Sequence, residues 1–327
     1  MRETVGGKRV LITGGLGFIG SALARRLIDL GAEVTIVDSL VPEYGGNRFN
    51  IAGIEERVRV NVSDVRDEHS FRYLVQGQEI LFNLAGQTSH LDSMTDPFTD
   101  LDINVRAQLS IVETCRQVNP SIRIVFASTR QIYGKPETLP VDEKHLLHPI
   151  DVNGVHKMAG EWYHILYNNV YGIRACALRL TNTYGPRMRV KDARQTFLGV
   201  WIRRLLQNEP IEVWGGEQLR DFTFVDDAVE AFLLAAAPET AGSIYNLGGA
   251  EPPVTLRELA ELLVQVNGGG EVRGMPFPPD RKAIDIGDYY ADFSKARREL
   301  GWTPRVGLEE GLRRTLDFYR EHLGHYL

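Results

Sequence analysis

The chain has 327 residues, of which 43% are hydrophobic and 24% are charged, and this length fits two lobes better than one small core. The two cysteines, Cys115 and Cys176, lie far apart inside apolar stretches, which excludes a disulfide framework and a cysteine-rich metal site. The 37 basic and 43 acidic residues give a net charge of −6 with no long basic run, and no apolar run is long enough to span a membrane. We therefore expect a cytoplasmic protein that binds neither nucleic acid, membrane nor metal.

Short β-branched runs alternate with longer helical patterns from Lys8 onward, which is typical of a parallel sheet with helices on both faces. In the longer segments, apolar residues recur at the spacing of one helix face. The predicted strands are Arg9–Thr13, Glu33–Val37, Val58–Val62, Ile80–Leu84, Ile122–Ala127 and Arg174–Leu180. The predicted helices between them are Ile19–Leu30, Phe98–Val118 and Val155–Val170.

After Leu180 the pattern changes to longer loops rich in glycine, proline and arginine, with helices between them. Residues 1–180 are predicted to form a doubly wound α/β lobe, to which residues 223–249 return. Residues 181–222 and 250–327 are predicted to form most of a smaller α/β lobe that closes over the first. The helices predicted after Leu180 are Ala193–Leu206, Asp226–Ala236, Leu256–Val266, Ser294–Leu300 and Leu308–Leu323.

A glycine-rich turn follows the first strand and opens the first long helix, with the sequence Thr13-Gly14-Gly15-Leu16-Gly17-Phe18-Ile19-Gly20. Its glycines permit a tight turn and close backbone approach, so a pyrophosphate can sit on the free N–H groups of the helix N-terminus. Asp38 ends the next strand about 20 residues later, where a carboxylate accepts from a ribose 2′-hydroxyl and repels a 2′-phosphate. The pattern therefore predicts a dinucleotide site and favours NAD over NADP.

Further motifs are spaced along the whole chain: Asp38, Asp64-Val65, Asn83-Leu84-Ala85-Gly86, Asp96-Pro97, Asn104, Ser128-Thr129 with Tyr133-Gly134, Lys157, Arg179-Leu180-Thr181-Asn182 with Tyr184-Gly185-Pro186, Arg220-Asp221-Phe222, and Ala291-Asp292 with Gly301-Trp302. This ordered set resembles the extended short-chain dehydrogenase/reductase family, and within it the NAD-dependent sugar-nucleotide epimerases and dehydratases. The resemblance implies a Rossmann-like lobe that carries NAD and a C-terminal lobe that carries a nucleotide diphosphate sugar. It also implies a homodimer formed through the helices Phe98–Val118 and Val155–Val170, whose apolar stripes could instead be used on their own sheet.

The resemblance also implies which residues contact each ligand. For the cofactor they are Gly14, Gly17, Phe18, Ile19, Gly20, Asp38, Asp64, Val65, Leu84, Ala85, Gly86 and Lys157. For the sugar nucleotide they are Gln87, Thr129, Asn182, Gln195, Arg220 and Arg281. Three of these positions have a structural alternative. Asp64 could be a strand-end cap, Arg220 could form a surface salt bridge, and Gln195 could belong to a helix cap.

The catalytic position departs from the family pattern. Enzymes of this family use a Ser or Thr, a Tyr and a Lys, and the Tyr and Lys lie four residues apart on one helix face. Thr129 and Lys157 match this pattern, but the residue four before the lysine is Asn153. An amide can hydrogen-bond a sugar oxygen but has no proton to exchange near neutral pH, so it cannot act as the general base. We therefore predict Thr129, Asn153 and Lys157 as the catalytic positions, with the base itself still to be found.

Three hypotheses account for the missing phenol. Another group could replace it, the substrate could assist a related redox step, or the protein could bind NAD and a sugar nucleotide without turnover. For a replacement base, the sequence offers a water held by Asn153 and four side chains. Of these, His156 is expected to be exposed and Tyr133 to pack under the sheet. The four side chains are His90, Tyr133, His156 and Tyr184.

The residues after Thr129 bear on the reaction. Family 4,6-dehydratases carry an Asp-Glu pair there that supplies the proton transfers of elimination, whereas this chain has Arg130-Gln131. Dehydration is therefore disfavoured. Epimerisation needs only reversible hydride transfer, and a UDP-sugar 4-epimerase is the first hypothesis because that activity is the commonest in the family. A CDP-sugar 2-epimerase and a catalytically silent binding protein are the alternatives.

Overall fold

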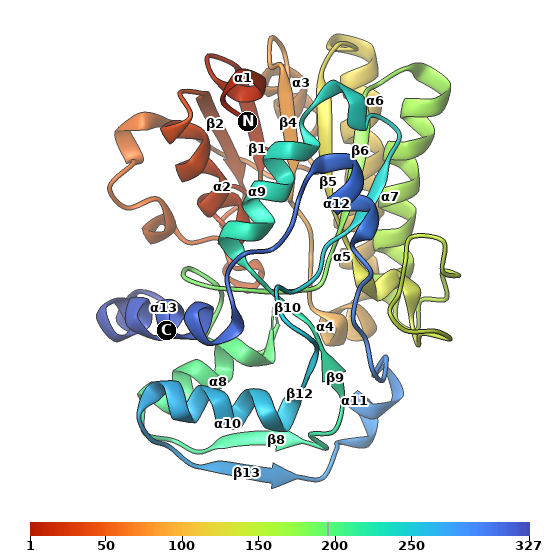
Figure 1. Ribbon diagram of the computed structural model, residues 1–327. Helices are drawn as coiled ribbons and strands as arrows, with labels where there is room; N and C mark the ends of the chain where they lie inside the picture. Colours follow the sequence, from red (N-terminus) through yellow and green to blue (C-terminus); the bar gives the residue numbers. More distant parts are fainter. Residues whose placement is uncertain (195) are drawn as a thin grey trace.

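The computed structural model describes residues 1–194 and 196–327 and consists of two lobes, one above the other in Figure 1. The upper lobe contains a seven-stranded sheet in the order β11-β6-β5-β4-β1-β2-β3, and every neighbouring pair of strands is parallel. The predicted doubly wound α/β class is therefore confirmed. The strands are β1 (Arg9–Thr13), β2 (Glu33–Asp38), β3 (Val58–Val62), β4 (Ile80–Asn83), β5 (Arg123–Thr129), β6 (Ala175–Leu180) and β11 (Ile244–Asn246).

Helices cover both faces of this sheet because successive residues of a strand point to opposite sides. In β1, Val10 and Ile12 belong to the core that includes residues of α2 and α9. Leu11, between them, belongs to a separate core with residues of α3, α6 and α7. The edge strand β3 is only partly buried. The helices are α2 (Phe18–Asp29), α3 (Glu68–Leu74), α6 (Ala107–Val118), α7 (Val152–Tyr171) and α9 (Val225–Ala235).

Three predicted helices differ from the observed ones by three residues or more. Helix α7 begins at Val152 rather than at Val155, because the carboxylate of Asp151 accepts a hydrogen bond from Gly154 N and caps the helix. The segment predicted as one helix over Phe98–Val118 is interrupted by a π-helical stretch, Asp102–Arg106, between α5 (Pro97–Leu101) and α6. The helix predicted to begin at Ala193 begins four residues later, because the hydroxyl of Thr196 accepts a hydrogen bond from Leu198 N and caps α8 (Phe197–Leu206). A side-chain cap does not change the apolar spacing, and a π-helical stretch of one turn shifts it too briefly to stand out, so periodicity alone does not show either feature.

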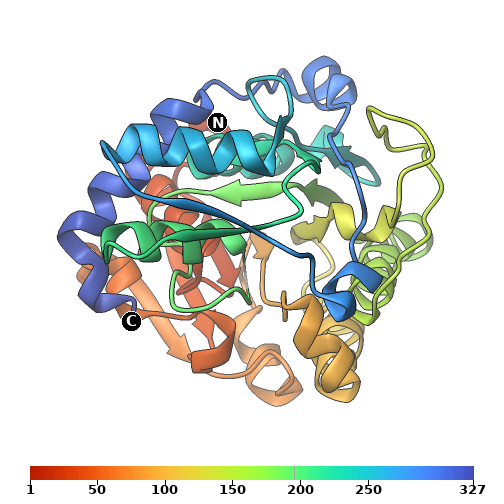
Figure 2. The same ribbon diagram turned by 90° about the horizontal axis from the view of Figure 1, so that it is seen from below.

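The lower lobe consists of helices packed on short two-stranded sheets, seen from below in Figure 2. β8 pairs in parallel with β13, and α10 contacts α8 and α13 beside them. β7 pairs with β10 in parallel, and β9 pairs with β12 in antiparallel orientation. The elements are β7 (Asn182–Tyr184), α8, β8 (Ile211–Trp214), β9 (Leu219–Arg220), β10 (Phe222–Phe224), β12 (Val254–Thr255), α10 (Leu256–Asn267), β13 (Val272–Met275) and α13 (Leu308–His322).

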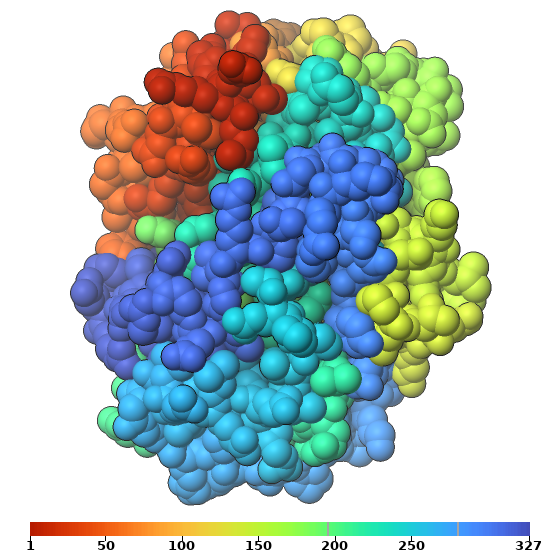
Figure 3. Space-filling model, viewed as in Figure 1, coloured from red at the N-terminus to blue at the C-terminus, as the bar shows by residue number. Residues whose placement is uncertain are grey.

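The chain crosses between the lobes more than once. The segment 223–246 contributes α9 and β11 to the upper lobe, and α12 (Ser294–Leu300) contacts both of them. Figure 3 shows the late residues, coloured blue, lying across both lobes. The Trp302 indole donates to the carbonyl of Asp227, which fixes this crossing. In the described parts of the chain, no helix is both long and apolar enough to cross a membrane. The remaining helices are α1 (Arg2–Val5), α4 (His90–Thr95) and α11 (Pro279–Ala283).

Candidate active site

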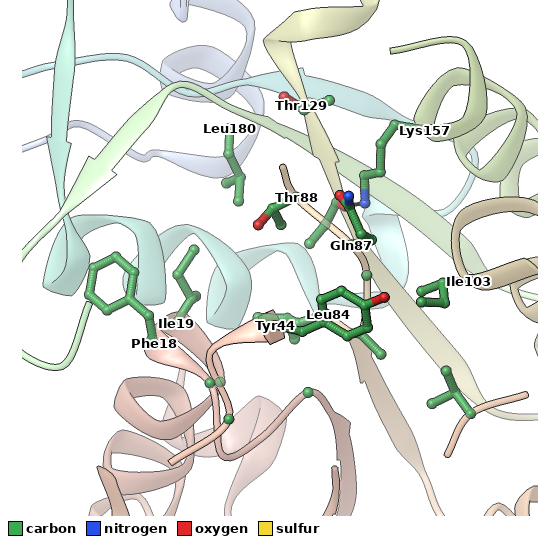
Figure 4. A pocket seen from close by; sticks show the side chains of 18 of the residues that line it. Phe18, Ile19, Tyr44, Leu84, Gln87, Thr88, Ile103, Thr129, Lys157 and Leu180 are labelled. Atoms are coloured by element: carbon green, nitrogen blue, oxygen red, sulfur yellow. Dashed lines mark hydrogen bonds between the residues drawn. The ribbon is translucent and has the colours of Figure 1, made fainter. Parts of the chain in front are cut away.

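A pocket opens at the carboxyl ends of the central strands. Residues that follow β1, β2, β3, β4, β5 and β6 line it, together with Asn153 and Lys157 of α7. Open α/β sheets bind their ligands at this edge, where the connections diverge to opposite faces. Figure 4 shows Phe18 and Ile19, from the start of α2, on one side of the pocket and Gln87 and Lys157 pointing toward one another on another side.

The glycine turn forms a close-fitting cradle at the start of α2. Gly14 has φ +69°, and a Cβ on Gly20 would lie 2.3 Å from the carbonyl oxygen of Gly14. Helix α2 begins after Gly17 with no side-chain cap, so its first N–H groups are available to an anion. Gly14, Gly17 and Gly20 all line the pocket. The backbone here fits a pyrophosphate because these three pocket-lining positions carry no side chain.

Asp38 lies at the end of β2 and lines the same pocket. Its carboxylate accepts hydrogen bonds from Leu16 N at 3.0 Å and Leu40 N at 2.9 Å, which fix its orientation. Burial raises the pKa of Asp38 from its ordinary value, although these two backbone bonds oppose the shift. A carboxylate has about four acceptor sites, so two remain for the hydroxyls of a ribose.

We predict that Asp38→Asn reduces the preference for NAD over NADP at least tenfold. The change removes an ionised acceptor, whose hydrogen bonds are worth about 1.5–3 kcal/mol, and also the charge that repels a 2′-phosphate. Calorimetric titration of both dinucleotides measures the ratio of their Kd values. Asp64→Asn, the matched control in the same pocket, should leave the ratio unchanged, and an unchanged ratio in Asp38→Asn would refute the role of Asp38.

Asp64 and Val65 also line the pocket, but the Asp64 carboxylate is already bound. Arg66 Nη2 lies 2.6 Å from Asp64 Oδ2, and Arg66 Nε lies 3.0 Å from both carboxylate oxygens. Burial acts to raise the pKa of Asp64, but the bonds from Arg66 outweigh it and hold the pKa below its ordinary value. This geometry favours the structural interpretation of Asp64, and its contact with adenine stays a prediction.

Thr129, Asn153 and Lys157 meet in this pocket although they come from β5 and α7. Lys157 Nζ donates to the carbonyl of Ala127 at 2.6 Å and lies 4.5 Å from the centroid of the Phe126 ring. Burial lowers the pKa of Lys157 to about 8. The ammonium therefore lies at the pocket wall, where a ligand hydroxyl can reach it.

Asn153 is held by a buried carboxylate and a neighbouring backbone. Its Nδ2 donates to the carbonyl of Gln87 at 2.9 Å and to Asp100 Oδ2 at 3.0 Å. The other oxygen of Asp100 lies 2.7 Å from His156 Nδ1, and Asp100 is fully buried. The expectation that His156 is exposed is therefore wrong, because its side chain turns toward Asp100 and is 14% exposed. These contacts fix the Asn153 amide, which still has no group that titrates near neutral pH.

His90 is the only one of the four proposed replacement side chains that lines the described pocket. Its Nδ1 lies 2.9 Å from Asp151 Oδ2. The hydroxyl of Tyr133 is buried between Arg179 and Asn246, and burial raises its pKa to about 12. The hydroxyl of Tyr184 donates to a backbone carbonyl in the core. Tyr133 thus packs as expected, and neither phenol faces a ligand.

Asp151 holds His90 from the start of α7. Its Oδ1 caps the helix by accepting from Gly154 N at 2.6 Å, and its Oδ2 accepts from Gln131 Nε2 at 2.8 Å. Burial acts to raise the pKa of Asp151, but His90 and these hydrogen bonds outweigh it, and the pKa lies below its ordinary value. The carboxylate is therefore ionised near neutral pH and places a negative charge beside the imidazole of His90.

The predicted substrate residues separate into two groups. Gln87, Thr129 and Asn182 line the pocket. Arg220 does not line it, because its guanidinium binds the carbonyl of Leu219 and the carboxylate of Asp285. The guanidinium of Arg281 lies over the Trp214 ring, 4.4 Å from its centroid, and also outside the pocket. Substrate contacts of Arg220 and Arg281 stay predictions, and Gln195 lies outside the described residues.

Several pocket residues were not assigned to a ligand from the sequence, and two of them carry polar groups large enough to reach one, Tyr44 and Arg130. Tyr44 reaches the pocket from the segment between β2 and β3, and Arg130 reaches it from the residue after Thr129. Tyr44 lies in a loop with no motif, so no sequence pattern singled it out. Arg130 lies beside a predicted catalytic residue, which is a signal that could have placed it in the site.

The fold and the pocket define a two-lobed dinucleotide-binding protein with a second group of polar residues beside the cofactor cradle. The model of the NAD dependent epimerase/dehydratase family matches residues 10–248, and the chain belongs to this family. Its members use NAD on nucleotide sugars, so this much of the predicted function is confirmed.

Relatives and solved structures match nearly the whole chain. UDP-glucuronic acid decarboxylase 1 of Xenopus tropicalis is 33% identical over 97% of this chain and 73% of its own length. The UDP-glucose 4-epimerase of Thermotoga maritima, solved with UDP-glucose, has a TM-score of 0.88 at 30% identity over 96% of this chain and 99% of its own. The UDP-glucose 4-epimerase of Thermus thermophilus, solved with NAD, has a TM-score of 0.85 at 31% identity over the same shares.

Proposed function

We propose that this protein epimerises a nucleotide diphosphate sugar through a transient keto-sugar, as a UDP-sugar 4-epimerase does. The observation that carries the proposal is that Thr129 and Lys157 share one pocket with the glycine cradle. The two UDP-glucose 4-epimerases of similar structure support uridine and the C4 position. A CDP-sugar 2-epimerase and a silent binding protein are the alternatives.

The residues along the pocket match the successive parts of an NAD molecule. Bound NAD would take a hydride from a sugar carbon and return it to the opposite face. The cradle of Gly14, Gly17 and Gly20 would bind the pyrophosphate, and Asp38 the adenosine ribose. Lys157 would bind the nicotinamide ribose, since its ammonium lies at the wall beside Gly86. Thr129 would orient the sugar hydroxyl that reacts.

The pair of His90 and Asp151 supports a replacement for the missing phenol. His90 Nδ1 lies 2.9 Å from Asp151 Oδ2, so a neutral imidazole with its proton on Nδ1 would present that proton to the carboxylate and keep its lone pair on Nε2. Nε2 would accept the proton of the sugar hydroxyl when the hydride leaves, and return it when the hydride comes back. Asn153, held by Asp100, would hydrogen-bond the sugar rather than exchange protons.

One experiment separates turnover from silent binding. The purified protein is incubated with NAD and UDP-, GDP-, CDP- or dTDP-linked sugars in deuterated water, and the sugars are followed by NMR. We expect one sugar to give a new diastereomer that retains protium at the inverted carbon, because the hydride returns from the cofactor. Deuterium at that carbon would indicate proton abstraction instead, and no product from any sugar that binds would overturn the proposal.

We also propose a homodimer, formed through one face of α7 and the adjoining α6. Helix α7 exposes an apolar stripe, and Leu109 of α6 is exposed as well. Residues four, seven and eight apart share a helix face, so these side chains form one continuous stripe. The exposed members on α7 are Val155, Trp162, Leu166 and Val170.

The cytoplasmic location stays a prediction.

We predict that Trp162→Glu dissociates the dimer. An aromatic side chain buried in an interface contributes about 2 kcal/mol or more to the free energy of association, so the Kd of the dimer should rise roughly 30-fold or more. Light scattering coupled to gel filtration over a range of concentrations measures the change. Tyr73→Glu changes an exposed aromatic on α3, outside the proposed interface, and should leave the mass unchanged. A monomeric wild type would refute the dimer.

A further inference from the structure

Arg130 has no ionic partner within the described residues. It follows Thr129 directly, lines the candidate active site, and its Nε is buried without a hydrogen-bond partner. Its guanidinium carbon lies over the ring of Tyr289, 5.5 Å from the ring centroid. Burial lowers the pKa of Arg130, although two neighbouring carboxylates oppose this shift. A buried N–H group without a hydrogen bond is destabilising, so an anion that accepts from the Arg130 guanidinium would relieve a cost present in the free protein.

The two nearby carboxylates are bound elsewhere. Asp221 is buried and accepts from the Thr181 hydroxyl and from Ala291 N. Asp285 lies 3.1 Å from Arg220 Nη2 and pairs with that arginine. Both attract Arg130 only through space. The fork of Arg130 therefore remains available to an anion that enters the pocket.

We propose that Arg130 binds the carboxylate of an acidic sugar, so that the substrate class is a nucleotide-linked uronic acid. This inference rests on the proposed function. The guanidinium belongs to the residue next to Thr129, which would orient the reacting hydroxyl, and this places the cation beside the sugar rather than beside the dinucleotide. A planar guanidinium matches a carboxylate with two parallel hydrogen bonds, and a neutral hydroxymethyl group would leave it unpaired.

A diphosphate is the other anion that could reach Arg130. Asn182, predicted to contact the diphosphate, lines the pocket at the start of β7, whereas Arg130 follows β5. The two sources differ in what loss of the guanidinium should do. If Arg130 binds the diphosphate, its loss weakens the binding of all uridine nucleotides together. If Arg130 binds the sugar carboxylate, its loss weakens only the binding of the uronate.

The test measures binding of UDP, UDP-glucose and UDP-glucuronate to the NAD-loaded protein by calorimetry. We expect the wild type to bind UDP-glucuronate more tightly than UDP-glucose. Arg130→Gln should weaken the affinity for UDP-glucuronate roughly 10- to 100-fold, which is the range for a lost charged hydrogen bond. The affinities for UDP and UDP-glucose should stay within about twofold of the wild type. Arg130→Lys should recover part of the loss, because it keeps the charge without the fork.

The controls make the outcomes distinct. Arg257→Gln removes an exposed arginine of α10 and should change none of the three affinities. Equal weakening of all three ligands by Arg130→Gln would assign the residue to the diphosphate and overturn the uronate proposal, as would no change at all. Failure of the wild type to bind any of the three would instead count against the proposed uridine sugar substrate. Thermal unfolding of each variant checks that Arg130→Gln is folded.

Discussion

Replacing His90 with glutamine is expected to lower kcat for epimerisation by roughly 10²–10⁴-fold while leaving NAD and the sugar nucleotide bound. The imidazole lines the pocket and its Nδ1 lies 2.9 Å from the buried carboxylate of Asp151, whereas no other proposed replacement side chain lines it. Glutamine keeps a polar side chain of similar length but cannot take a proton. Steady-state kinetics, with bound NAD measured by its absorbance after denaturation, separates lost chemistry from lost binding.

Chemical rescue gives a readout that a structural role would not move. His90→Gly leaves a space where the imidazole was. Because the His90 side chain is 38% exposed, imidazole added to the solution can enter this space and should restore part of the activity. His69→Gln, on the exposed surface of α3, is the control and should keep full activity. Wild-type kcat in His90→Gln, or a loss confined to NAD binding, would show that His90 is not the proton acceptor. Lys157 would then be the next group to test, since its pKa of about 8 allows a neutral amine.

Glu161→Gln is expected to destabilise the protein by about 3–5 kcal/mol, because it leaves the buried guanidinium of Arg179 without its counter-charge. Arg179 binds Glu161 through two nitrogen–oxygen contacts of 2.6 and 3.0 Å, and both side chains are buried. Ser128 donates to the same carboxylate at 2.6 Å, and Tyr133 accepts from Arg179 at 2.6 Å. The network joins β5, β6 and α7 directly behind the pocket, so its loss should lower the midpoint of urea unfolding.

A double-mutant cycle isolates this pair. The single variants Glu161→Gln and Arg179→Met should each lower the free energy of unfolding by several kcal/mol. The double variant should lower it by less than the sum of the two, because no unpaired charge remains. Arg313→Gln breaks an exposed pair with Glu310 on α13 and should cost less than about 1 kcal/mol. Additive effects of Glu161→Gln and Arg179→Met would rule out the coupling.

Much of the fold can be predicted from the sequence because the patterns that indicate it are local. The central strands are apolar runs bounded by turn residues, and the cradle needs glycine at Gly14 and Gly20 whatever lies around it. β11 was not predicted as a strand, since a three-residue run has no distinct pattern and pairs only because α9 returns the chain to β6. The interruption over Asp102–Arg106 was missed for a similar reason, as a π-helical insertion does not alter the residue types.

The site shows the same division. The sequence by itself determined that a cofactor cradle is followed by an acid at Asp38, and that an amide stands where the family has its phenol, because these are statements about residue types at fixed spacing. The tertiary structure alone decided that His90 meets Asp151 across 61 positions and that Arg220 turns to Asp285. It also decided that Arg130 Nε is buried with no hydrogen bond to any residue that the structure describes. Partner choice for a charged side chain depends on which groups the packed lobes bring within a few ångströms, and no local pattern records that distance.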